Sequence, residues 1–186
     1  IIRKWIHTNN EINHKKRLSW HKPILKLAQK NRLIEDEAIS LSNMVKIQDR
    51  LGLFEESLND IKKVQKIWTA LCAKNEKYYH NLIVSYCDKS VTLRLQNRLP
   101  EALNTLYEGY EIIKKNGLDY DDALIILFSD LGIIYEKMLD YPAALNYFNQ
   151  SLNLIKRSQS NNIENQILCH INIGNVYKAS NRLNLA

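Results

Sequence analysis

Two neighbouring segments in the second half of the chain carry apolar residues at the spacing of an α-helix. In residues 121–138 these are Leu124, Leu127, Phe128, Leu131 and Tyr135. In residues 143–156 they are Ala144, Leu145, Phe148, Leu152 and Ile155. Steps of three and four residues place each set on one face of a helix. The pattern therefore predicts two amphipathic helices joined by a short turn at residues 139–142.

The same pattern recurs along the chain at a fixed period. Residues 131–135 (LGIIY) return 42 residues later as residues 173–177 (IGNVY), and residues 113–115 (IKK) return at the same distance as residues 155–157 (IKR). A fixed period of this size is typical of architectures that stack one helical unit many times. We therefore expect an all-α protein whose function is carried by an extended surface.

A set of seven residues indicates the kind of repeat. An aromatic residue, Leu-Gly, Tyr, Ala, a second aromatic residue and a small residue follow one another as Phe128, Leu131, Gly132, Tyr135, Ala144, Phe148 and Ser151. This order resembles the tetratricopeptide repeat, a helix-turn-helix unit. The 42-residue period is longer than the minimal unit of that family and is similar to the repeats of kinesin light chains and Pins-type scaffolds. The resemblance implies a right-handed α-solenoid, that is, a superhelix of antiparallel helix pairs.

The resemblance also suggests how the chain is divided. We expect about 3.5 to 4 repeats, at roughly residues 34–75, 76–117, 118–160 and, incomplete, 161–186. The helix of the incomplete repeat would expose an apolar face, which a continuing array or a homodimer through this helix would cover. Because the first residue is Ile1 and not Met, we expect a fragment of a larger scaffold protein.

Individual residues predict how the helices begin, end and approach one another. Asp140 suits the N-terminal cap and Pro142 the first turn of the helix that follows, and Gly117 suits a left-handed helix end. A glycine inside a helix costs about 1 kcal/mol relative to alanine. We therefore expect close helix packing at both Gly132, facing Ala144, and Gly174.

The net charge of +6 is concentrated in the basic N-terminal segment, residues 1–33, outside the repeats. Residues 1–30 hold eight Lys or Arg against one acid, so the rest of the chain has a net charge of −1. Residues 19–30 are predicted to form a capping helix that packs on the first repeat, through Trp20, Ile24, Leu25 and Leu27. The remainder of the segment is expected to be a solvated basic arm.

The sequence contains no motif typical of catalysis and no segment long and apolar enough to span a membrane. No nucleotide-binding, metalloprotease or hydrolase motif is present, so we expect no enzymatic activity and no cofactor. His7, His14 and His21 recur every seven residues, a spacing that does not suit metal ligands. Three cysteines without CxxC spacing indicate buried reduced thiols, and no apolar run approaches the roughly 20 residues of a membrane span. We therefore expect a cytoplasmic protein.

The family resemblance implies that a peptide segment or a helix of a partner protein binds the concave groove formed by the first helix of each pair. The residues at the corresponding positions are Asn43, Lys46, Asp88, Val91, Arg94, Asp130, Ile133, Glu136, Asn172 and Asn175. Asp88 and Asp130 would repel an acidic C-terminal tail of the kind that some members of the family bind. A basic or neutral segment is therefore the favoured ligand.

Other interpretations of the same residues remain open. The residues at the groove positions could also be simply the polar face of each helix, because any exposed helix carries such residues. The repeats could form the regulatory or sensor region of a larger signalling or transcription-regulating protein, and the basic segment could occupy the acidic groove until a partner displaces it. RNA binding through the basic segment is a lesser alternative, because the body of the chain is not basic.

Overall fold

The computed structural model describes the backbone of residues 2–117, 121–158 and 163–183 and the side chains of residues 13–117, 121–158 and 163–181. These residues form eight α-helices and one short 3-10 helix, η1 (Glu76–Tyr78), with no strand among them. The α-helices are α1 (Ile2–Lys30), α2 (Ile34–Leu51), α3 (Phe54–Cys72), α4 (Tyr79–Leu95), α5 (Leu99–Asn116), α6 (Asp121–Lys137), α7 (Tyr141–Arg157) and α8 (Ile163–Leu183). The predicted all-α class is confirmed.

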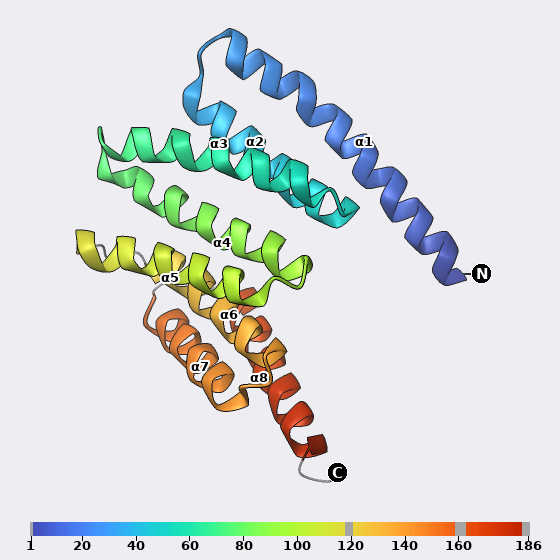
Figure 1. Cartoon of the computed structure of the whole chain (residues 1–186), viewed down its shortest axis with the longest axis vertical. Coiled ribbons are helices and arrows are strands. Elements are labelled where there is room, and N and C mark those ends of the chain that lie inside the picture. Colours follow the sequence, from blue (N-terminus) through green and yellow to red (C-terminus); the bar gives the residue numbers. More distant parts are fainter. Residues whose placement is uncertain (1, 118–120, 159–162, 184–186) are drawn as a thin grey trace. The chain divides into compact units, whose positions relative to one another are not determined.

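The helices form two compact units, Ile1–Gln96 and Asn97–Ala186. In the first unit α1, α2, α3 and α4 pack in chain order, and α2 also contacts α4 (Figure 1). In the second unit α5, α6, α7 and α8 pack in the same way, and α6 also contacts α8. Each unit thus combines contacts between sequence neighbours with a contact between helices two places apart, as expected for stacked helix pairs.

Each unit has its own apolar core. In the first unit the large side chains that are almost fully buried are Leu41, Val45, Ile61, Val64 and Ile83. In the second they are Leu106, Leu127, Leu131, Ile134, Phe148, Ile155 and Val176. Ser151 is also buried. Its hydroxyl donates a hydrogen bond to the carbonyl of Ile125 at 3.0 Å and forms another with Ser129 Oγ at 2.9 Å. The small polar side chain therefore lets α6 and α7 pack closely without leaving its hydroxyl unpaired.

The turns of the helix pairs share one backbone feature. Gly52, Asn97 and Leu139 have φ angles of 73°, 60° and 64°, in the left-handed region. They stand 45 and 42 residues apart, so the left-handed residue recurs with the repeat. After Leu139, Asp140 Oδ1 accepts a hydrogen bond from the backbone N–H of Ala143 at 3.1 Å, which confirms the predicted cap. The predicted left-handed helix end at Gly117, with φ 59°, is also confirmed.

The N-terminal segment differs from its prediction in two ways. Its helix does not begin near residue 19, because α1 is continuous from Ile2 to Lys30, with Pro23 inside it. Moreover, Trp20, Ile24 and Leu27 are more than half exposed, so the prediction that they pack on the first repeat is wrong. Ala28 is buried, and Leu18 and Leu25 are partly buried on the same helical face. Helix α1 therefore has two apolar stripes. The stripe of Leu18, Leu25 and Ala28 faces the rest of the unit, and the stripe with the bulkier Trp20 is exposed.

The two glycines inside helices also differ from each other. A Cβ atom added to Gly132 would lie 2.6 Å from the ring of Phe148, so the close approach is made by Phe148 of α7 rather than by Ala144. At Gly174 such an atom would meet nothing within 4 Å, so the packing expected there is absent from the described residues. The apolar face of α8 is exposed as predicted, with Ile167, Ile171 and Tyr177 each more than half accessible.

Candidate functional site

Five of the predicted groove residues lie on α2 and α4 of the first unit, which contact each other. Asn43 and Lys46 lie on α2 and are exposed. Asp88, Val91 and Arg94 follow one another at three-residue steps on α4 and are partly buried. The first unit therefore presents a short polar surface with one apolar position, Val91, at its centre.

Asp88 is the residue of this surface whose ionisation is most perturbed. Burial raises its pKa to about 6, the positive charge of Lys46 opposes that rise, and the negative charge of Asp49 adds to it. Among the described residues its carboxylate accepts no hydrogen bond and forms no ion pair, although its backbone carbonyl accepts one from Thr92 at 3.1 Å. Asp88 is thus a partly buried acid whose acceptor capacity is unused.

Asp49, one turn of α2 beyond Lys46, is held by neighbouring hydroxyls. The Thr92 hydroxyl lies 3.0 Å from each of its carboxylate oxygens and 3.1 Å from the Ser57 hydroxyl. Burial raises the pKa of Asp49, while the hydrogen bonds from Ser57 and Thr92 and the charge of Arg94 lower it. The partners of Asp49 come from α3 and α4, so this acid stabilises the unit and leaves Asp88 as the available acceptor.

The other five predicted residues lie on α6 and α8 of the second unit, which also contact each other. Asp130, Ile133 and Glu136 on α6 and Asn172 on α8 are partly buried, and Asn175 is exposed. Ile133 packs against the buried cluster of Ala144, Phe148 and Val176, so part of its side chain belongs to the core. The grouping of all ten residues into one groove stays a prediction.

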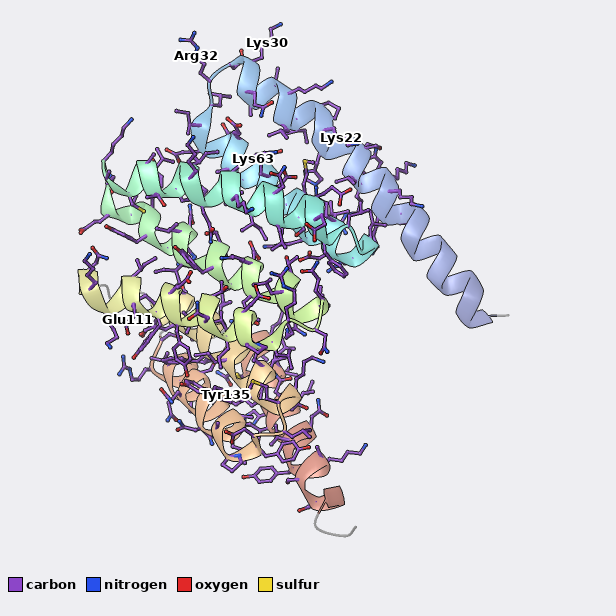
Figure 2. All side chains as sticks on the ribbon, in the orientation of Figure 1. Lys22, Lys30, Arg32, Lys63, Glu111 and Tyr135 are labelled. Atoms are coloured by element: carbon purple, nitrogen blue, oxygen red, sulfur yellow. The ribbon has the colours of Figure 1, made fainter. Side chains whose placement is uncertain are left out.

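Three tyrosines of the second unit join three of its helices. The hydroxyl of Tyr107 on α5 lies 2.9 Å from that of Tyr135 on α6 and 3.0 Å from that of Tyr147 on α7. The rings of Tyr135, labelled in Figure 2, and Tyr147 are stacked with centroids 5.5 Å apart. The hydrogen bond with Tyr107 raises the pKa of Tyr135 to about 12. With raised pKa values, Tyr107 and Tyr135 stay neutral at physiological pH, and the three rings act in packing.

The structure shows a pocket between α1 and α2 that was not predicted from the sequence. Its volume is about 300 Å³, and it is lined by Arg17, His21, Asn43, Lys46, Ile47 and Arg50. The spacing of Asn43, Lys46 and Arg50 places them on one face of α2, which could be read from the sequence. The contribution of Arg17 and His21 could not, because it depends on which face of α1 packs against α2.

Comparison with known proteins supports the architecture. The sequence matches no protein-family model and no curated protein. The structure matches the crystal structure of BtubC (BKLC) from P. vanneervenii with a TM-score of 0.69 at 18% sequence identity, over 93% of this chain and 68% of that one. BtubC is a tetratricopeptide-repeat protein of the kinesin light chain type. The fold is that of a tetratricopeptide-repeat solenoid. At this level of identity the match establishes the fold alone.

Three further observations concern features outside the predicted groove. No described helix combines the length and the apolar composition that crossing a bilayer requires. Within the described ranges, no three His, Cys, Asp or Glu side chains gather as metal ligands would. Cys72, Cys87 and Cys169 are buried thiols that form no disulfide, as predicted, and burial raises the pKa of Cys72.

Proposed function

We propose that the first unit of this tetratricopeptide-repeat chain binds a peptide segment of a partner protein across α2 and α4. The fold supports a role in protein interaction, since stacked helix pairs present extended surfaces rather than enclosed catalytic pockets. The observation that carries the proposal is Asp88, a partly buried carboxylate with no hydrogen-bond or ion-pair partner among the described residues.

Asp88 determines the kind of segment that we propose as ligand. A partly buried acceptor without a partner in the protein gains most from a charged donor, because charge-assisted hydrogen bonds are roughly twice as strong as neutral ones. A Lys or Arg side chain is therefore the preferred group at this position, with Val91 beside it for an apolar contact. The favoured ligand is a basic or neutral segment, bound with micromolar affinity, about −8 kcal/mol.

We propose that the second unit presents a similar surface of its own, on α6 and α8, through Asp130, Glu136, Asn172 and Asn175, with the exposed part of Ile133 beside them. The three buried free thiols fit a reducing compartment, so we place the protein in the cytoplasm. We also propose that the chain is part of a larger scaffold.

The proposal can be tested with peptides selected from a random display library on the wild-type protein. We expect the selected peptides to share a Lys or Arg and Asp88→Asn to weaken their binding by roughly tenfold, as loss of a charge-assisted hydrogen bond predicts. Asp36→Asn removes the same charge from an exposed position at the start of α2 and should leave affinity unchanged. Equal losses in the two variants, or selected peptides without any basic preference, would contradict the role of Asp88.

The pH dependence of binding gives an independent measurement. With a pKa of about 6, Asp88 is largely ionised at pH 7 and largely protonated at pH 5. Affinity for a basic peptide should therefore fall between pH 7 and pH 5, because the protonated acid no longer attracts a cation. Asp88→Asn should abolish most of this fall. Titrations of both proteins by fluorescence anisotropy would show whether the dependence persists without the carboxylate, which would assign it to another group.

A further inference from the structure

The pocket between α1 and α2 gathers basic side chains from two different helices. Arg17 and His21 stand one turn apart on α1, and Lys46 and Arg50 stand one turn apart on α2. The amide of Asn43 and the aliphatic side chain of Ile47 complete the lining, and the volume is about 300 Å³. No acidic side chain contributes to the lining. The pocket therefore concentrates positive charge in a concave space.

These basic groups are not neutralised within the first unit. Among the described residues, Arg17, His21, Asn43 and Arg50 form no hydrogen bond or ion pair through their side chains. Lys46 interacts electrostatically with Asp88 but does not form an ion pair with it. The side chains described on α1, those of residues 13–30, include five more cations and no acid: Lys15, Lys16, Lys22, Lys26 and Lys30. A concave surface lined by one sign of charge raises the local concentration of ligands of the opposite sign.

The donors in the pocket suit carboxylates better than a phosphate group. All six lining residues lie inside helices, so the pocket offers side-chain donors and no free backbone N–H groups of a helix N-terminus. Phosphate sites commonly depend on such N–H groups. The planar guanidinium groups of Arg17 and Arg50 can each bind a carboxylate through two parallel hydrogen bonds. The volume accommodates more than one acidic side chain, with Ile47 as an apolar contact.

We infer that this pocket binds the carboxylate groups of an acidic peptide segment of a partner protein. The sequence had predicted that acidic segments are disfavoured, on the strength of Asp88 and Asp130. The pocket instead gives acidic groups a place of their own, beside Asp88 and separated from it by Lys46. The inference does not depend on a partner contact at Asp88. Of the six residues that line the pocket, only Lys46 interacts with Asp88.

The experiment measures binding of a fluorescein-labelled hexaglutamate peptide to the full chain by fluorescence anisotropy, at low and at physiological salt. The variant Arg17→Glu/Arg50→Glu reverses two charges of the pocket and leaves Lys46 and Asp88 intact. The matched control, Lys62→Glu/Lys66→Glu, makes the same change in net charge on exposed positions of α3. We expect at least a roughly tenfold loss of affinity in the pocket variant and less than about twofold in the control.

Further measurements check that the variants fold and define the results that would contradict the inference. Helicity by circular dichroism identifies a variant that fails to fold, in which case Arg17→Gln/Arg50→Gln, a milder change at two exposed positions, replaces it. Similar losses in the pocket and control variants would overturn the inference, since binding would then follow net charge alone. Tighter binding of inorganic phosphate or of single-stranded RNA than of hexaglutamate, if lost in the pocket variant, would overturn the assignment to an acidic peptide.

Discussion

At the scale of single residues, the two helix-internal glycines show how one sequence signal can have two physical meanings. Gly132 and Gly174 occupy the same position of consecutive repeats. At Gly132 the ring of Phe148, itself fully buried, occupies the space that a side chain would need. At Gly174 that space is empty among the described residues. Only the first glycine is required by packing in this structure.

We expect alanine at these two positions to have opposite effects on stability. Gly132→Ala should lower the free energy of unfolding by about 1–2 kcal/mol, because the cost of overpacking, about 1–3 kcal/mol, exceeds the gain in helix propensity. Gly174→Ala should raise it by about 0.5–1 kcal/mol, since it gains propensity and meets no neighbour. Urea-induced unfolding followed by circular dichroism measures both, and a stabilised Gly132→Ala protein would refute the close contact with Phe148.

Asp88 is a second single residue whose properties depend on its surroundings. Val91 and Arg94 on α4 are partly buried in the same way, yet the raised pKa and the unpaired carboxylate of Asp88 distinguish it from them. The sequence identified Asp88 as a candidate, and its role in binding stays a prediction. Its raised pKa could not be predicted, because the desolvation that causes it comes from side chains of other helices.

At the scale of elements, the turns within helix pairs depend on one left-handed residue each. Glycine and asparagine adopt this conformation at low cost, whereas leucine does so at roughly 1–2 kcal/mol. Gly52 and Asn97 therefore suit their turns, and Leu139 does not. The side chain of Leu139 is 64% exposed, so no burial offsets the cost. Leu139 nevertheless adopts the left-handed conformation, because the turn of the repeat falls at this position, 42 residues after Asn97.

We expect Leu139→Asn to raise the free energy of unfolding by about 1 kcal/mol, since it removes the strain and loses little buried apolar area. The reverse exchange at the equivalent position of the preceding turn, Asn97→Leu, should lower it by a similar amount. Thermal unfolding of both variants provides the comparison. A loss of stability in Leu139→Asn would mean that the leucine side chain makes contacts that outweigh its backbone strain.

At the scale of the whole molecule, contacts run between neighbouring helices. In the second unit α6 contacts α5, α7 and α8, and in the first unit α2 contacts α1, α3 and α4. In repeat proteins the stability is approximately a sum of terms for each unit and for each nearest-neighbour interface. A local change should therefore be felt mainly by the helices that share contacts with it.

Native-state hydrogen exchange can test this expectation. Gly132→Ala should accelerate amide exchange in α6 and α7 and leave α2 and α3 close to their wild-type rates, because the disturbed contacts lie in the second unit. The wild-type protein at the same pH and temperature is the reference. An equal acceleration in all four helices would show instead that the chain unfolds as a single cooperative unit.

The sequence by itself determined the all-helical repeat, the cap at Asp140 and the left-handed end at Gly117. These features depend on residues close together in the chain, whose spacing and turn preferences can be read directly. The packed face of α1, the basic pocket that it forms with α2 and the pKa of Asp88 were decided by the tertiary structure. The physical reason is that each of these depends on side chains that another helix brings close, and contacts of that kind cannot be read from the spacing of residues along the chain.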